Sequence, residues 1–341
     1  MLFRSPVIVQ GGIGPHSVAA LKVAGASGVL LDWQVAMFDE AGLPAEITSA
    51  VARMDGSETR LYGEDGALPF RAFSRPGNAA AAAAAEIEGA VTEDVARYDA
   101  IAALVTPDKP AEALWPMGQD AALAQALHGL GGPAGRLGTA LTELARHADT
   151  AAARAARLAP LAEGAPLARA IGTRYPIVQG PMTRVSDVPD FAVAVAEGGA
   201  LPFIALALMR GEEADGVLRT TRARMAGRPW GVGILGFVDD DLREAQTALI
   251  AAHRPDFALI AGGRPDQALA LERDGIPTFL HVPSPGLLSL FLESGARRFI
   301  LEGRECGGHV GPRTSAILWE QAIAAIEAHY GPDGEIDCDI L

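Results

Sequence analysis

Residues 298–313 read R-F-I-L-E-G-R-E-C-G-G-H-V-G-P-R, and they place a single histidine among glycines directly after a short apolar run. The run at residues 298–301 is too short for a helix and follows a Gly-Ala turn, so it predicts a buried strand. In proteins that alternate strands and helices, chemistry collects at the carboxyl ends of the strands. His309 therefore stands where an active-site residue is expected.

The surroundings of His309 suit a flat ligand. An imidazole in this setting can exchange a proton near neutral pH. The alternative is a turn histidine that only caps the next helix, and the residues alone leave the two interpretations equally good. Glycines let the backbone approach a ligand closely and allow positive φ, and the four that flank the histidine are Gly303, Gly307, Gly308 and Gly311.

A regular alternation of strands and helices extends upstream from this stretch. Helical segments such as residues 191–197 and 242–253 separate short apolar runs, and a further strand begins near Cys338. Alternation of this length implies a parallel sheet, and a barrel is the commonest closed solution. We therefore predict an α/β fold of the TIM (β/α)8 barrel type. Its first six strands are expected at residues 176–179, 201–206, 230–235, 257–260, 278–282 and 298–301.

The composition excludes several classes of function. A net charge of −14 without a Lys/Arg-rich block would repel a phosphate backbone, so no nucleic-acid partner is expected. Cys306 and Cys338 give neither a disulfide framework nor zinc spacing, so we expect a reducing compartment and no structural metal. The sequence has no signal peptide and no apolar run of spanning length, so we expect no membrane association and a cytoplasmic location.

The beginning of the chain predicts a separate βαβ unit. Residues 6–14, P-V-I-V-Q-G-G-I-G, read as a strand that ends in a glycine turn. A helix at residues 16–24 and a strand at residues 29–31 follow. Residues 1–5 leave no room for a domain entrance, so we interpret them as a junction in an incomplete gene.

The middle of the chain, residues 38–167, has a different pattern. Residues 59–62 and 70–73 read as a β-hairpin, and Asn78 caps an alanine run of high helix propensity. We interpret this region as a helical lid or linker subdomain, with a flexible spacer as the alternative. Its remaining helices are expected at residues 120–127 and 137–161.

Three motifs in the second half resemble one known family. They are Y-P-I-V-Q-G-P-M at residues 175–182, W-G-V-G at residues 230–233 and E-C-G-G-H-V-G at residues 305–311. Their order and spacing resemble the nitronate monooxygenase family, formerly called 2-nitropropane dioxygenases. That family includes FMN-dependent enoyl-acyl-carrier-protein reductases and related domains embedded in polyketide and polyunsaturated fatty acid synthases. The resemblance covers strands one to six of the family's flavin-binding barrel.

The resemblance implies an FMN-dependent oxidoreductase of the nitronate monooxygenase type, forming one domain of a polyketide or fatty-acid synthase. One alternative is an enoyl-acyl-carrier reductase that uses NAD(P)H. An alternative of another class is a catalytically inactive scaffold that docks an acyl carrier protein. The implied substrate is a small molecule or a carrier-bound acyl group.

The first half resembles the end of the same barrel. Residues 6–14 and 28–32 are similar to strands seven and eight of the family, and W-P-M-G-Q at residues 115–119 is similar to a segment after the barrel. The tetrapeptide I-V-Q-G occurs twice, which fits either a duplication or a pattern common to βαβ units. The implied domains are 1–37, the end of one barrel copy, 38–167, the lid or linker, and 168–341, the start of the next copy.

Two arrangements of these pieces are open. The fragment could close as a circularly permuted barrel, with the strand at Pro6 beside the strand at Arg298 and residues 38–167 as a lid. Alternatively, each piece belongs to a separate barrel, which leaves exposed sheet edges that favour aggregation.

The resemblance also assigns site residues. FMN would lie over the strand ends, and His309 would take or deliver a proton beside the substrate carbon. A glycine turn at Gly11 and Gly12 would offer backbone N–H groups to the FMN phosphate. The expected cofactor contacts are Gly180, Pro181, Met182, Gly233, Ser284, Gly307, Gly308, Gly11 and Gly12.

Two positions depart from the family pattern. Gly233 stands where the family typically has asparagine, and so loses a side-chain hydrogen bond to flavin. Asp32 stands where the family commonly has glycine, and a carboxylate would repel a phosphate.

Other residues near the motifs are more ambiguous. Arg304 and Arg313 could contact an anionic carrier or cofactor phosphate, or form surface ion pairs. His281 and Ser284 end the fifth strand on the same rim as His309, and Ser284 is the better candidate for a cofactor contact. Cys306 has no base partner in the sequence and is not expected to be a nucleophile.

Overall fold

The computed structural model describes residues 5–106, 112–331 and 334–341, and the chain folds into two compact units. The N-terminal unit comprises Met1–Arg154 and Pro312–Gln321, and the sheet unit comprises Ala155–Gly311 and Ala322–Leu341. Of the expected junction at residues 1–5, only Ser5 falls in the described ranges. Within those ranges, no helix has the length and hydrophobicity that crossing a bilayer requires.

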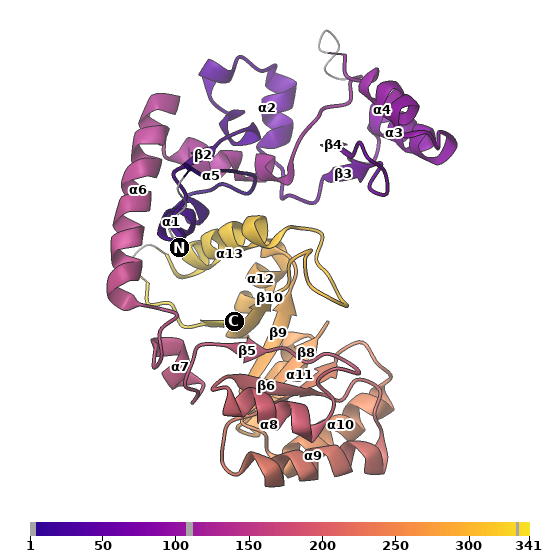
Figure 1. Ribbon diagram of the computed structural model, residues 1–341, viewed down its shortest axis with the longest axis vertical. Coiled ribbons are helices and arrows are strands. Elements are labelled where there is room, and N and C mark those ends of the chain that lie inside the picture. The colour runs from indigo at the N-terminus through magenta and orange to yellow at the C-terminus, as the bar shows by residue number, and fades with distance from the viewer. Residues whose placement is uncertain (1–4, 107–111, 332–333) are drawn as a thin grey trace. The chain divides into compact units, whose positions relative to one another are not determined.

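The sheet unit contains a seven-stranded parallel sheet whose strands lie in sequence order (Figure 1). Consecutive neighbours with a helix between them give the strand order of a (β/α) barrel, which differs from the reversing order of a doubly wound sheet. The predicted α/β class and the six predicted strands are confirmed, and the strand expected near Cys338 is the seventh. The strands are β5 (Val178–Gln179), β6 (Leu201–Ala205), β7 (Gly231–Leu235), β8 (Phe257–Ala261), β9 (Thr278–Val282), β10 (Arg298–Leu301) and β11 (Asp339–Ile340).

Helices alternate with these strands. Figure 1 shows α8, α9 and α10 gathered on one side of the sheet. Pro189, Pro265 and Pro285 each stand in the first turn of their helix, where a missing N–H has no cost and a fixed φ favours the helix. The helices are α7 (Pro166–Ala170), α8 (Pro189–Glu197), α9 (Gly211–Met225), α10 (Asp240–His253), α11 (Pro265–Arg273), α12 (Pro285–Glu293) and α13 (Ser315–Tyr330).

Both faces of this sheet are buried, and each strand contributes side chains to both because successive side chains point to opposite faces. One face carries Phe203, Leu259 and Phe279, which pack together in one cluster. The other face packs against the helices, and it includes Ile204, Val232, Ile260 and Leu280. Each such side chain contributes about 1.5–3 kcal/mol when it is fully buried.

Gly231 in β7 makes room for the ring of Phe203. A β-carbon on Gly231 would overlap three ring atoms of Phe203. Because Phe203 is fully buried, its ring has little space to move away. The first glycine of W-G-V-G is therefore required by core packing.

The N-terminal unit contains the predicted βαβ unit and the predicted hairpin. β1 (Ile8–Gln10) pairs in parallel with β2 (Gly28–Leu30) across α1 (Ser17–Val23). β3 (Thr59–Tyr62) and β4 (Phe70–Phe73) pair in antiparallel register. The other helices are α2 (Ala45–Val51), α3 (Ala79–Ala90), α4 (Asp94–Ala102), α5 (Ala124–Gly129) and α6 (Leu137–Leu158), with short 3-10 turns η1 (Trp33–Val35), η2 (Asp39–Ala41) and η3 (Gln119–Leu123).

The alanine run of α3 is packed. Asn78 caps the helix as predicted, since its side chain accepts a hydrogen bond from the N–H of Ala81 at 2.8 Å. Ala80, Ala81 and Ala84 are buried in a cluster with Tyr62. The small side chains let the helix pack closely in this cluster.

The expected pairing between the strand at Pro6 and the strand at Arg298 is wrong for the described residues. β11 pairs with β10 instead, through Arg298 with Asp339 and Phe299 with Ile340. β1 belongs to a separate two-stranded sheet with β2. A strand that follows β10 after one helix continues the sequential strand order of the sheet and closes a shorter loop, which costs less entropy.

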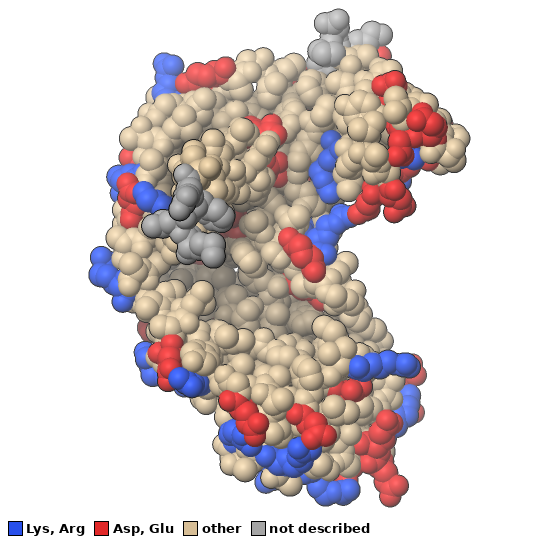
Figure 2. All heavy atoms as spheres, viewed as in Figure 1, with Lys and Arg blue, Asp and Glu red and all other residues tan. Residues whose placement is uncertain are grey.

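Acidic and basic side chains are interspersed on the face shown in Figure 2. On α9, Arg219 lies 2.7 Å from Asp215 one turn earlier, and their side chains are 70% and 33% exposed. Exposed pairs of this kind contribute about 0–1 kcal/mol. The core therefore dominates the stability of the sheet unit.

We expect Gly231→Ala to lower the free energy of unfolding by about 1–3 kcal/mol, because the added methyl group overpacks the site beside Phe203. Gly216→Ala is the matched control, since Gly216 lies inside α9 and a β-carbon there would have only the end of the Arg219 side chain nearby. The control should be stabilised by up to about 1 kcal/mol through helix propensity. Urea denaturation measures both, and equal effects would contradict the packing role of Gly231.

Candidate functional site

A cavity of about 270 Å³ lies at the carboxyl ends of the strands in the sheet unit. This volume is close to the lower limit for small-molecule sites. Loops after β5 and β10 form part of its wall, and residues of β6, β7, β8 and β9 complete it. Six of the residues predicted from the motifs line it: Pro181, Met182, Gly233, Gly307, Gly308 and His309.

Gly233 has a packing role in the wall of this cavity. A β-carbon on Gly233 would overlap the ring of Pro181. The loop after β5 can therefore approach β7 only because residue 233 lacks a side chain. A side chain as large as asparagine at residue 233 would collide with Pro181 in this arrangement.

Other glycines leave open space. A β-carbon on Gly180, Gly307 or Gly308 would meet no atom within 4 Å. Gly308 also has φ of +83°, a conformation that favours glycine. Gly180 precedes Pro181 on the loop after β5 and is not part of the cavity wall. Gly307 and Gly308 therefore leave space for a ligand at the edge of the cavity.

His309 is exposed on the loop that follows β10. Its ring packs edge-on against Phe237, with ring centroids 5.2 Å apart and planes inclined by 63°. The loop closes on itself, because the N–H of Gly311 donates to the carbonyl of Gly303 at 3.4 Å. His309 is thus held at the rim while its imidazole stays accessible.

A second imidazole lies in the wall of the same cavity. His281 belongs to β9, on the same face as Phe279, and Glu302 directly follows β10. Nδ1 of His281 lies 3.3 Å from Oε1 of Glu302, and the side chains are only 18% and 12% exposed. The angles are not those of a hydrogen bond, so this buried Nδ1 has no hydrogen-bond partner among the described residues.

Sequence reasoning singled out His281 by its position at a strand end, but it missed Glu302 and Phe237. The signal for Glu302 was available, because it is the first residue after β10 and so belongs to the rim. The sequence has no local signal for Phe237, which follows β7 by two residues.

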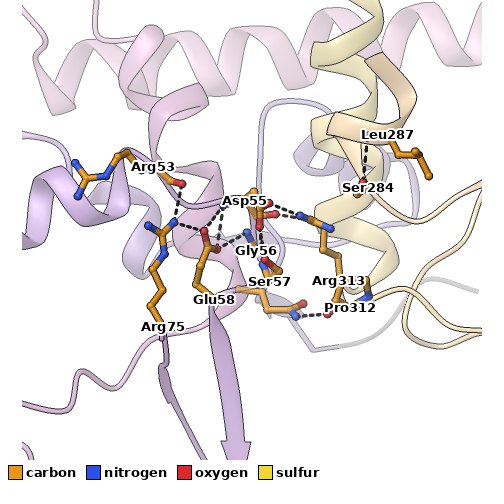
Figure 3. A network of polar contacts seen from close by, with 11 residues as sticks. Arg53, Asp55, Gly56, Ser57, Glu58, Arg75, Ser284, Leu287, Pro312 and Arg313 are labelled. Atoms are coloured by element: carbon orange, nitrogen blue, oxygen red, sulfur yellow. Dashed lines mark hydrogen bonds and ion pairs between the residues drawn. The ribbon is translucent and has the colours of Figure 1, made fainter. Parts of the chain in front are cut away.

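Ser284 has a structural role. It is the N-cap of α12, where its hydroxyl accepts a hydrogen bond from the N–H of Leu287 at 3.2 Å (Figure 3). Ser284 is not part of the wall of the cavity that contains His309. Its hydroxyl is therefore engaged in capping, and the expected cofactor contact is not supported by this geometry.

Gly11 and Gly12 lie in the N-terminal unit, where they line a separate cavity of about 350 Å³. Both have positive φ, +89° and +65°, as the glycine turn predicted. The wall also carries Asp120. Burial, and then the nearby charge of Asp32, raise the pKa of Asp120. Two carboxyl groups beside this turn oppose phosphate binding there, which agrees with the repulsion expected from Asp32.

Gln119 fixes the start of α13 within the N-terminal unit. Its side-chain nitrogen donates to the carbonyl of Pro312 at 2.7 Å, and its side-chain oxygen accepts from the N–H of Thr314 at 2.9 Å. The last residue of the W-P-M-G-Q motif therefore forms hydrogen bonds with the backbone that leads into α13.

Arg313 is buried. It therefore forms neither the surface ion pair nor the contact with an anionic carrier that its sequence suggested. Its guanidinium lies 2.7 Å from the carboxylate of Asp55, and Arg313 is 3% exposed (Figure 3). Burial alone would raise the pKa of Asp55, but hydrogen bonds from Ser57 and the charge of Arg313 outweigh it and lower the pKa. Arg304, by contrast, is exposed on the His309 loop.

In the ranges 5–106, 112–331 and 334–341, no group of three or more His, Cys, Asp or Glu side chains could hold a metal ion.

Parts of the chain are similar in fold to parts of several solved structures. FabK from Thermotoga maritima matches with a TM-score of 0.43 and 24% identity, over 47% of this chain and 50% of that one. A nitroalkane oxidase from Streptomyces ansochromogenes matches with a TM-score of 0.40 and 22% identity, over 51% and 66%. The enoyl reductase domain of MlnA, from the macrolactin biosynthesis cluster of Bacillus amyloliquefaciens, matches with a TM-score of 0.40 and 14% identity, over 51% and 49%.

The chain spans about half to two thirds of the length of these solved structures. No protein-family model matches the chain. No curated protein sequence matches it either. Function therefore has to come from the residues of the site.

We expect Ser284→Ala to lower the free energy of unfolding by about 1 kcal/mol, because the first turn of α12 loses its cap. Ser294→Ala is the control at the other end of the helix, where the hydroxyl donates to the carbonyl of Leu290 in an exposed position. The control should change stability by less than about 0.5 kcal/mol. Chemical denaturation compares the two, and an unchanged stability of Ser284→Ala would contradict the capping role.

The raised pKa of Asp120 gives a pH-dependent prediction. Above its ordinary pKa of 3.8 the unfolded chain releases this proton while the folded chain retains it, so this group lowers the free energy of unfolding as pH rises towards the folded pKa. Asp120→Asn removes this loss, so the variant should gain stability over the wild type as pH rises from about 4. Urea denaturation at several pH values tests this, with the exposed Asp65→Asn as control. A difference that does not change with pH would contradict the prediction.

Proposed function

We propose that the chain is part of an FMN-dependent oxidoreductase of the nitronate monooxygenase type, within a polyketide or fatty-acid synthase. The observation that carries the proposal is the gathering of six motif residues around one cavity with His309 at its rim. These residues come from three separate motifs, so a chance pattern in one motif does not account for their meeting. Oxidoreductase chemistry is chosen because the motif resemblance and the open, glycine-lined wall both suit a flavin ring.

The protein residues have distinct tasks in this proposal. Pro181 and Met182 would contact the flavin ring, and Gly307 and Gly308, which line the same cavity without side chains, would leave room for it. FMN, when bound, would carry the electrons. His309 would take or deliver a proton at its imidazole, and its contact with Phe237 limits how the ring can turn.

The runner-up is reduction of an enoyl thioester with NAD(P)H as the electron donor. A second, mostly apolar cavity beside the site favours an acyl substrate. An acyl carrier protein would then be the partner that delivers it. The third interpretation is an inactive scaffold that docks such a carrier, and it predicts a protein that binds no flavin.

We expect the purified protein to bind FMN, seen as a flavin absorbance spectrum that survives gel filtration. His309→Ala should retain FMN and lose about 10²–10⁴-fold in turnover, the range of general acid–base catalysis. Cys306→Ala, an exposed residue on the same loop, is the matched control and should retain turnover.

Two assays separate the reactions. Oxidation of the 2-nitropropane anion with O₂ tests the first proposal, and oxidation of NAD(P)H with a 2-enoyl thioester tests the runner-up. A protein that cannot be loaded with FMN would reject both and favour the scaffold. Equal turnover in the wild type and His309→Ala would remove His309 from the mechanism.

A further inference from the structure

A histidine–glutamate pair lies in the wall of the candidate site, where two neighbouring strands end. Ile300 of β10 pairs with His281 of β9, and residues two apart on a strand share a face. Glu302 therefore follows Ile300 on the face that carries His281. The N–H of Glu302 donates to the carbonyl of Val282 at 3.1 Å, so the strand ladder continues past β10 and fixes the backbone beside both side chains.

The two polar side chains lie next to an apolar interior. Phe203, Leu259 and Phe279 pack on this face of the sheet, and His281 and Glu302 are mostly buried at its end. A carboxylate that is withdrawn from water costs free energy unless a partner compensates it. In the ranges that the structure describes, no lysine or arginine pairs with Glu302, so His281 is its ionic partner there.

The two ring nitrogens of His281 have different surroundings. Nδ1 has no exposed surface and lies 3.3 Å from Oε1 of Glu302. The 18% of the side chain that stays exposed must then lie on its other atoms, which leaves Nε2 as the ring nitrogen that can meet a ligand. His281 lines the cavity that contains His309, so a ligand of that cavity is within reach of this ring.

This arrangement fits a proton acceptor. A proton on Nδ1 faces the carboxylate, which leaves the lone pair of Nε2 free to accept another. The present angle at Nδ1 is not that of a hydrogen bond, but at 3.3 Å a small rotation of either side chain is enough to form one. Catalytic hydrogen bonds often tighten only when a ligand is bound. Glu302 would then hold the imidazole in the accepting tautomer and stabilise the imidazolium that forms.

We propose that His281 is a second proton-transfer residue of this site and that Glu302 positions it. The inference deepens the proposed function and rests on it for the substrate class, a compound with an acidic C–H bond next to a nitro group. In the transfer this C–H bond breaks, the proton moves to Nε2 of His281, and the electron pair stays on the substrate as a nitronate anion. The step needs no oxidant, and the imidazolium then returns the proton to solvent. His281 thus prepares the anion, and His309 serves the later, flavin-dependent step.

Exchange of the methylene hydrogens of nitroethane with D₂O, followed by proton NMR, measures this transfer alone. The measurement needs neither O₂ nor NAD(P)H, and it uses the full chain with or without FMN. The protein should accelerate the exchange above the rate in buffer. His281→Ala should lower the protein-catalysed rate by about 10²–10⁴-fold, the range of general acid–base catalysis.

Two further measurements separate a chemical role from a structural one. Glu302→Gln keeps the shape of the side chain, but its amide can donate to Nδ1 and so favours the tautomer with the proton on Nε2, and the rate should fall at least about 10-fold. Free imidazole should restore exchange in His281→Ala, because it can enter the space of the missing ring. His253→Ala is the matched control, since His253 of α10 is a mostly buried histidine that lies 2.7 Å from Asp215 of α9, and it should retain the rate.

The outcomes separate this inference from the proposed function. Exchange that falls in both His281→Ala and Glu302→Gln, and that imidazole restores in His281→Ala, supports the proton-transfer pair, whether or not the protein takes up FMN. FMN uptake and His309-dependent turnover, with exchange that is unchanged in His281→Ala, would overturn this inference alone. Exchange no faster than in buffer, exchange lost only in His309→Ala, or an equal loss in His253→Ala would overturn it as well.

Discussion

Side chains of a parallel strand that is buried on both faces have only two directions in which to point, and this constraint arranges the site. On the interior face, Phe203 fills the space above Gly231, and Phe279 lies two residues before His281. The same alternation that builds the core thus carries Gly233 and His281 to the mouth of the sheet. The pairing register of the strands therefore places both the packed interior side chains and the residues that line the cavity.

The sequence predicted the strands of the sheet unit because apolar runs of four to six residues between helices are a local signal. It predicted the strand near Cys338 but not that this strand pairs with β10. Which strand pairs with β10 depends on the entropic cost of bringing that strand to the edge of the sheet. The sequence of the strand alone does not give this cost. The resemblance of residues 6–14 to a seventh strand therefore suggested the wrong neighbour.

The site was predictable where a motif fixes backbone, as at Pro181, Gly233 and the His309 loop. It was not predictable where one side chain has two possible uses. Ser284 precedes a proline at a helix start, and the same hydroxyl that could bind a ligand caps α12 instead. Arg313 reads as a surface charge, yet it is buried against Asp55 from a segment more than 250 residues away in sequence.

The glycines of the His309 loop also have a thermodynamic consequence. A chain segment rich in glycine has more conformations to lose when it is held still, so fixing it against a ligand costs more free energy than fixing a segment with side chains. Part of any interaction with Gly307 and Gly308 is offset in this way, so the affinity is lower than the contacts alone would give. Amide hydrogens of Gly307 and Gly308 should then exchange readily with solvent in the free protein and slow down when the mouth is filled.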